Sequence, residues 1–134
     1  MTAASTPQSP LVSRLLRETQ CEVLFDAASR GRYSTDASIY QVQPVGVAVP
    51  RTEADALAAL GIASDLGVPI LPRGAGSSQC GQTVGAALVI DCSKHLRGVI
   101  EIDAANRLAI VEPGIVLDQL NAALKPHGLW YPVD

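Results

Sequence analysis

The sequence predicts an α+β fold, in which a strand–helix–strand unit (βαβ) is followed by a β-hairpin and a last helix. Residues 45–71 hold an apolar run, an amphipathic stretch and a second apolar run, in that order. Residues 99–103 and 107–112 alternate apolar and polar side chains on either side of a short turn. A period of two across a turn is typical of an antiparallel hairpin.

Composition narrows the class of protein. A length of 134 residues indicates one domain, and 48% hydrophobic residues suffice for a core. With 4% aromatic residues, that core is built from Ala, Val, Leu and Ile. A net charge of −3 with ten Lys and Arg residues argues against nucleic-acid binding.

The ends of the chain give expectations about location. Residues 1–10 are small and polar, without the apolar core of a signal peptide, so we predict a disordered tail. No apolar run approaches the roughly 18 residues that span a bilayer, so we expect no transmembrane segment. The predicted location is the cytoplasm, with peripheral membrane contact as an alternative.

The cysteines and histidines do not form a metal motif. Cys21, Cys80 and Cys92 lack C-x-x-C spacing, and no histidine stands at a ligand spacing from them, so no metal site is predicted. Cys80 can be a small packing residue or the neighbour of a ligand, and we expect packing. His95 and His127 are expected at the surface or at helix ends, because no carboxylate or nucleophile stands beside either one.

The region 11–44 is predicted as a helix followed by a loop. Leucine and valine residues recur at helical spacing over 11–18, which indicates a helix there. Residues 29–41 are mostly polar and are predicted as a loop. The domain proper is expected to begin at residue 45.

The βαβ unit has clear boundaries. A strand over 45–49 ends at a proline, and Thr52 with Asp55 forms a box-like helix start. The helix over 53–66 is expected to bury Leu57, Leu60 and Leu66, and Gly67 supplies its left-handed stop. A strand over 68–71 follows, parallel to the first after a right-handed crossover.

The second half begins with a buried strand over 86–91 that ends in an acid. In the hairpin, we expect the apolar side chains of both strands on one face and a second face in solvent. The acids Glu101, Asp103 and Glu112 are expected to be solvated rather than catalytic. Leucines at 117, 120 and 124 predict a helix that ends near Gly128.

The most informative segment is residues 71–85, LPRGAGSSQCGQTVG, which has four glycines and two serines. Glycine permits unusual backbone angles and close approach of a ligand, and successive amides can form a nest for an anion. The third position of a dinucleotide fingerprint is Gln79 rather than glycine, and the lysine of a triphosphate loop is missing. We therefore predict a metal-free diphosphate site.

Two alternatives stay open for this segment. The glycines of residues 71–85 can simply make a long, tight turn. Arg73 can reach a phosphate or a ribose, or it can brace the loop through the loop's own carbonyl groups.

Four stretches resemble, in order, the amino-terminal part of the flavin-binding domain of the FAD-linked oxidase superfamily, the group of vanillyl-alcohol oxidase and p-cresol methylhydroxylase (PCMH). They are VAVPRTEADA (47–56), VPILPRGAGSS (68–78), LVIDCS (88–93) and VEPGIVLDQL (111–120). Two further stretches, YSTDASIY (33–40) and QTVG (82–85), resemble the branch of D-lactate, glycolate and D-2-hydroxyglutarate dehydrogenases.

The resemblance implies that residues 45–134 are the first, incomplete subdomain of a PCMH-type FAD-binding domain. It implies FAD held without a covalent bond, because Ser77 stands where some members carry the histidine that attaches the flavin. The residues implied to wrap the pyrophosphate are Arg73, Gly74, Ala75, Gly76, Ser77, Ser78, Gly81 and Gln82. Those implied to run along the cofactor are Pro132 and Asp134.

The resemblance further implies an FAD-dependent enzyme that oxidises a D-2-hydroxy acid and passes the electrons to an acceptor that the sequence does not identify. The catalytic base lies outside these residues, so this amino-terminal fragment is expected to be inactive alone. The resemblance also allows an iron–sulfur cluster in the missing carboxyl-terminal part. The alternative is a non-catalytic α/β module that binds a nucleotide or a protein.

Overall fold

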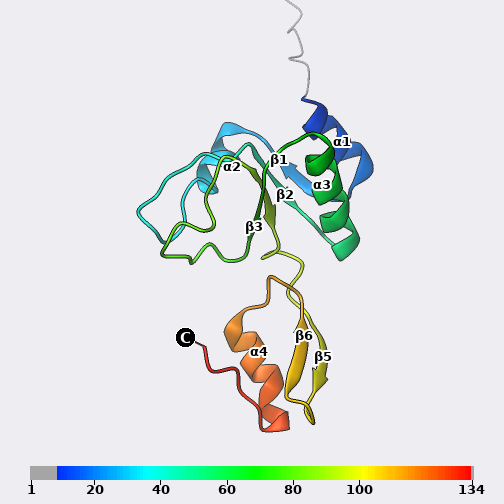
Figure 1. Cartoon of the computed structure of the whole chain (residues 1–134), viewed down its shortest axis with the longest axis vertical. Helices are drawn as coiled ribbons and strands as arrows, with labels where there is room; N and C mark the ends of the chain where they lie inside the picture. Colours follow the sequence, from blue (N-terminus) through cyan, green and yellow to red (C-terminus); the bar gives the residue numbers. More distant parts are fainter. Residues whose placement is uncertain (1–8, 134) are drawn as a thin grey trace, which may run out of the picture.

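The computed structural model describes residues 9–133, and within that range the chain forms a four-stranded sheet, a separate two-stranded hairpin, and flanking helices (Figure 1). In chain order the elements are α1 (Pro10–Glu18), β1 (Glu22–Leu24), α2 (Ala27–Arg32), β2 (Gly46–Val49), α3 (Glu53–Asp65), β3 (Ile70–Arg73), β4 (Leu88–Asp91), β5 (Val99–Asp103), β6 (Leu108–Val111), α4 (Leu117–Leu124) and a 3-10 turn (Lys125–His127). This mixed architecture confirms the predicted α+β class.

The predicted tail falls mostly outside the described residues. The prediction is wrong at Pro10, the last residue of the predicted tail, because Pro10 is the first residue of α1. Ser9 caps this helix, accepting a hydrogen bond from the Val12 amide at 3.4 Å. Proline is favoured at the first helical position, where no N–H is needed.

The sheet has the strand order β1-β2-β4-β3. Strands β2 and β3 are each parallel to β4, which confirms that the two strands of the βαβ unit run in the same direction. They are not neighbours, because β4 lies between them. Strand β1 adds an antiparallel edge that the sequence did not predict.

The two faces of the sheet carry two apolar clusters. On one face, α1 and α3 pack over Ala48, Leu88 and Ile90. On the other face, a smaller cluster gathers around Val47, Val49 and Val89; Leu24, Tyr33 and Leu71 pack against it. The second face is the one on which the cavity described below opens.

Helix α3 has the predicted start but a different buried face. The Thr52 hydroxyl accepts from the Asp55 amide at 3.2 Å, and the Asp55 carboxylate accepts from the Thr52 amide at 3.1 Å, which confirms the capping box. The predicted leucine stripe is wrong at two of its three positions: Leu57 is 61% exposed and Leu66 is 38% exposed, and only Leu60 packs partly buried against the core. The buried residues of this face are Ala59, Ile62 and Ala63. Because the helix is rich in alanine and apolar on several sides, its leucines did not mark the face toward the sheet.

Several observed element boundaries differ from the predicted ones. Residues 29–32, predicted as loop, complete α2, whose cap Asp26 accepts from the Ser29 amide at 2.9 Å. The strand predicted at 68–71 is β3 at Ile70–Arg73, and that predicted at 86–91 is the shorter β4. Short elements such as β1 and α2 give too few residues for a periodic pattern.

The hairpin of β5 and β6 is confirmed, but the prediction that its apolar side chains gather on one face is wrong. Ile110 lies opposite Glu101, and Leu108 lies opposite Asp103. Residues opposite one another share a face, so these apolar side chains share theirs with acids and are 54% and 62% exposed. The register shifts between Val99 and Glu101, and an irregularity of one residue moves side chains to the other face.

Helix α4 ends as predicted. It passes into the 3-10 turn, which stops at Gly128 with a φ of 67°. The junction between the sheet and the hairpin is tight at Gly114, which is buried. A Cβ there would lie 2.1 Å from the Cys92 carbonyl oxygen and 2.7 Å from that of Leu96.

Candidate functional site

The glycine-rich segment, residues 74–85, leaves the carboxyl end of β3. In the described part of the chain, no hydrogen bond uses the backbone N–H groups of residues 74–78. Gly76 and Gly81 adopt positive φ angles of 72° and 81°, which favour glycine. The first half of the segment therefore presents a run of free amide donors, which is the requirement for an anion nest.

The second half of the segment is held by its own side chains. The Ser78 hydroxyl oxygen accepts from the amides of Cys80 (3.3 Å) and Gln82 (3.4 Å), and the Ser78 hydroxyl also contacts Gln82 Oε1. The side chains of these two predicted cofactor residues are thus engaged with each other. Cys80 is exposed, so its predicted role as a packing residue is wrong.

Arg73 braces the segment. Its Nη1 donates to the Thr83 carbonyl at 3.0 Å, and its Nη2 donates to the Thr35 carbonyl at 2.9 Å. The guanidinium also lies 5.3 Å from the centroid of the Tyr33 ring. A Cβ at Gly76 would lie 2.4 Å from Arg73 Nη2, so a side chain there would push the guanidinium out of this position. A contact of Arg73 with a phosphate stays a prediction.

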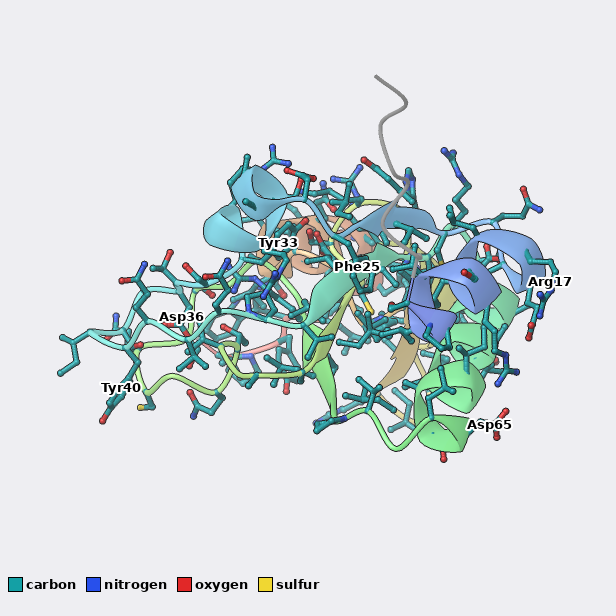
Figure 2. All side chains as sticks on the ribbon, turned by 90° about the horizontal axis from the view of Figure 1, so that it is seen from above. Arg17, Phe25, Tyr33, Asp36, Tyr40 and Asp65 are labelled. Atoms are coloured by element: carbon teal, nitrogen blue, oxygen red, sulfur yellow. The ribbon has the colours of Figure 1, made fainter. Side chains whose placement is uncertain are left out.

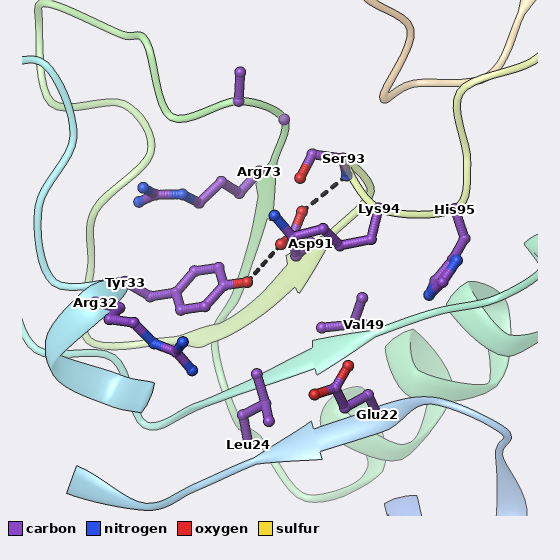
Figure 3. Close-up of a pocket in the computed structure, with 12 residues that line it drawn as sticks. Glu22, Leu24, Arg32, Tyr33, Val49, Arg73, Asp91, Ser93, Lys94 and His95 are labelled. Carbon is purple, nitrogen blue, oxygen red and sulfur yellow. Dashed lines mark hydrogen bonds between the residues drawn. The ribbon is translucent and has the colours of Figure 1, made fainter. Parts of the chain in front are cut away.

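A cavity of about 510 Å³ opens beside the first residues of the segment. Figure 3 shows the side chains that line it. Positive side chains from Arg32, Arg73 and Lys94 line it, against the acids Glu22 and Asp91. Its other lining residues are Leu24, Tyr33, Val49, Gly74, Ala75, Ser93 and His95. The cavity lies where β2, β3 and β4 end, and the carboxyl ends of parallel strands are where open α/β sheets bind ligands.

Asp91 is the most deeply placed acid of this cavity, at 2% exposure. Its carboxylate accepts from the Tyr33 hydroxyl at 2.6 Å and from the Ser93 amide at 2.8 Å (Figure 3). Burial, and then the hydrogen bond to Asp91, raise the pKa of Tyr33, so its phenol stays a donor. Sequence reasoning missed this pair, for which the only signal was a buried strand ending in an acid.

The structure brings most of the predicted site residues into one segment, but not all. Arg73, Gly74 and Ala75 line the cavity, and the other predicted pyrophosphate residues follow in the same segment. Pro132 is exposed beyond α4, in a stretch where the Tyr131 amide donates to Asn121 Oδ1 at 2.8 Å, and it does not line this cavity. Asp134 lies outside the described residues.

Within residues 9–133, no group of three or more His, Cys, Asp or Glu side chains is placed to hold a metal ion. None of the helices in that range combines the length and apolar character that crossing a membrane requires.

Comparison with known proteins places the chain in a family. A family profile described as FAD binding domain matches residues 44–134, which is more than half of the sequence. The chain therefore belongs to the FAD binding domain family, and the predicted resemblance is confirmed.

Curated relatives match over most of this chain. The D-2-hydroxyglutarate dehydrogenase of Pantoea ananatis is 39% identical over 107 residues, which cover 78% of this chain and 10% of the relative. The glycolate oxidase subunit GlcD of Bacillus subtilis is 38% identical over 117 residues, which cover 82% of this chain and 24% of that protein. The chain thus spans a tenth to a quarter of the length of these relatives.

Solved structures share the fold. An alkyldihydroxyacetonephosphate synthase superimposes with a TM-score of 0.76 at 17% identity, over 96% of this chain and 26% of that one. The substrate-bound p-cresol methylhydroxylase gives a TM-score of 0.68 at 17% identity, over 89% of this chain and 24% of that one. This confirms the predicted PCMH-type fold.

Proposed function

We propose that this chain holds the pyrophosphate of FAD in an oxidoreductase that acts on a D-2-hydroxy acid. The observation that carries the proposal is the run of free amides in residues 74–78, at the carboxyl end of β3. Membership of the FAD binding domain family supports FAD as the ligand. The substrate class comes from relatives named for D-2-hydroxyglutarate, glycolate and D-lactate.

The residues fit a diphosphate bound without a metal ion. The amides of Gly74, Ala75, Gly76, Ser77 and Ser78 would donate to phosphate oxygens, because no hydrogen bond in the described part of the chain occupies them. Gly81 and Gln82 close the segment, and Pro132 and Asp134 are proposed to run along the cofactor.

Positive charge around the cavity balances the phosphates in the absence of a loop lysine. The guanidinium groups of Arg32 and Arg73 and the ammonium of Lys94 line the cavity beside Gly74 and Ala75. Charges in a cleft with low-dielectric walls act over a longer range than the same charges in open water. They would therefore favour a dianionic ligand at the start of the segment.

The bound flavin would supply the redox chemistry, accepting hydride equivalents from the carbon that bears the substrate hydroxyl. This chain's own contribution is to bind and orient the cofactor, and we assign it no base. A longer protein would supply the base and the route to an electron acceptor, for which an iron–sulfur cluster is one proposal. We propose a cytoplasmic location, with contact to the membrane surface as an alternative.

The test is a titration of this chain with FAD, and separately with ATP, followed by calorimetry. We expect preference for FAD, and we expect Gly76→Ala to weaken binding about tenfold, because a φ of 72° strains a residue that has a Cβ and that Cβ would displace the Arg73 guanidinium. The matched control is Gly61→Ala in α3, where a Cβ meets nothing within 4 Å. Preference for ATP would favour a generic nucleotide module, and equal behaviour of the two variants would refute the assignment to this segment.

A further inference from the structure

A second segment, residues 33–41, lies alongside the glycine-rich segment although it precedes the family match at residues 44–134. We call it the anchoring segment. Figure 1 shows the two loops side by side, and Figure 2 shows Tyr33, Asp36 and Tyr40 spaced along the anchoring segment. Three sets of contacts join the two segments.

The first contact is the Arg73 guanidinium, which bridges the segments. One terminal nitrogen donates to the Thr35 carbonyl of the anchoring segment at 2.9 Å, and the other donates to the Thr83 carbonyl of the glycine-rich segment at 3.0 Å. The Tyr33 ring lies against the same guanidinium. Arg73 therefore ties the beginning and the end of the glycine-rich segment to a common support.

The second contact joins two side chains. Asp36 Oδ2 accepts from the Thr83 hydroxyl at 2.9 Å, while Asp36 Oδ1 accepts from the Ser38 amide at 2.9 Å. Hydrogen bonding from Ser38, with a further part from Thr83, lowers the pKa of Asp36 to about 2. The carboxylate is therefore ionised at neutral pH, and charge-assisted hydrogen bonds are stronger than neutral ones.

The third contact is between an aromatic ring and the backbone. A Cβ at Gly81 would lie 2.6 Å from Tyr40 Cδ2, so the ring of the anchoring segment covers the glycine at its left-handed turn. The anchoring segment is itself closed, because Thr35 and Gln41 form a β-bridge and the Val42 amide donates to the Ser34 carbonyl at 2.9 Å. The closed anchoring segment can therefore restrain the glycine-rich segment that it contacts.

We propose that Asp36 and Tyr40 are positioning residues that hold the glycine-rich segment in its amide-presenting conformation before the cofactor arrives. Glycine loses more conformational freedom on ordering than any other residue, so a glycine-rich segment binds poorly unless something else orders it. Preorganisation removes that loss from the binding step. The inference rests on the proposed function, because the ligand it serves is the FAD pyrophosphate.

The test uses Thr83→Val, which keeps the shape of the side chain and removes the hydroxyl that reaches Asp36. Its matched control is Thr83→Ser, which keeps the hydroxyl. Two quantities are measured: FAD affinity, and amide hydrogen exchange in the cofactor-free chain of Cys80, Gln82 and Val84, whose N–H groups donate hydrogen bonds within the glycine-rich segment. We expect Thr83→Val to weaken FAD binding about tenfold and to speed exchange, as one hydrogen bond to a charged group predicts. Thr83→Ser is expected to match the original chain in both.

A second pair guards against a folding defect. Asp36→Ala is expected to act like Thr83→Val, whereas Asp36→Asn keeps one accepting oxygen but loses the charge and the second acceptor, so its FAD affinity is expected to lie between those of Asp36→Ala and the original chain. Protection of the β4 amides must stay unchanged in all four variants, since a merely structural role would move it. Unchanged exchange and affinity in Thr83→Val and Asp36→Ala would overturn the inference. Faster exchange in a chain that binds no FAD would support the anchoring and refute the flavin site instead.

Discussion

The hydrogen bond between Tyr33 and Asp91 joins the start of the anchoring segment to β4, an inner strand of the sheet, across 58 residues of sequence. Replacing Tyr33 with phenylalanine removes the hydroxyl and keeps the ring that packs against Val47, Val49 and Val89. The Asp91 carboxylate would then keep only the Ser93 amide as a donor. A buried acceptor that loses a partner is left without compensation for its lost water.

The size of the effect follows from the character of this bond. A hydrogen bond to a charged group contributes roughly 1.5–3 kcal/mol, against a total stability of about 5–15 kcal/mol for a typical domain. At roughly 4 °C for each kcal/mol in a domain of this size, the midpoint of thermal unfolding should fall by about 6–12 °C. The stacking of Arg73 on the ring should survive, because the ring itself remains.

The loss in the free energy of unfolding is measured by urea denaturation, with circular dichroism as the signal. The matched control is Tyr131→Phe, because Tyr131 is exposed and its hydroxyl makes no hydrogen bond within residues 9–133. A loss below about 0.5 kcal/mol in Tyr33→Phe would refute the reasoning, since that is the range of surface substitutions. An equal loss in both variants would refute it as well.

Three further predictions concern other parts of the chain. Gly114→Ala should destabilise the chain by about 2 kcal/mol or more, because its Cβ meets two backbone carbonyls. Its control Gly61→Ala should stabilise the chain by about 0.5–1 kcal/mol, because alanine favours a helix and its Cβ meets nothing within 4 Å. Urea unfolding measures both changes. The amide of Gln20 and the capping box lower the pKa of Asp55 from its usual 3.8. Its contribution to stability should therefore be complete above about pH 4 and be lost as the pH falls through the folded-state pKa; a pH series in which Asp55→Asn is no less acid-sensitive would contradict this. Finally, flavin bound to this chain should be released by acid precipitation, because Ser77 offers no attachment; yellow protein in the pellet would show the opposite.

The parts of the fold that were predictable are those encoded by neighbouring residues. The capping box of Thr52 and Asp55 is a pattern of four residues, and the β5–β6 hairpin is a period of two across a turn. The glycine content of the glycine-rich segment already indicates that its backbone adopts angles that other residues avoid. In each case the signal and the structure occupy the same short stretch.

The parts that were not predictable depend on distant partners. Nothing near β4 indicates that it lies between β2 and β3, because strand order is decided by the packing of the whole sheet. Likewise, the loop reading of residues 29–41 gave no reason to expect Tyr33 beside Asp91 or Asp36 beside Thr83. Part of the candidate site, namely the support for its glycines, was therefore invisible until the chain was folded.

The order of strands has a consequence for how the protein is made. Within residues 9–133, β4 is the only neighbour of β3 in the sheet, and it is also the last of the four strands to leave the ribosome, so β3 lacks this partner until residue 91 has emerged. A nascent chain that stalls earlier carries an apolar strand with open edges, the kind of species that chaperones bind. A pause in translation within residues 74–91 would therefore prolong the exposure of β3.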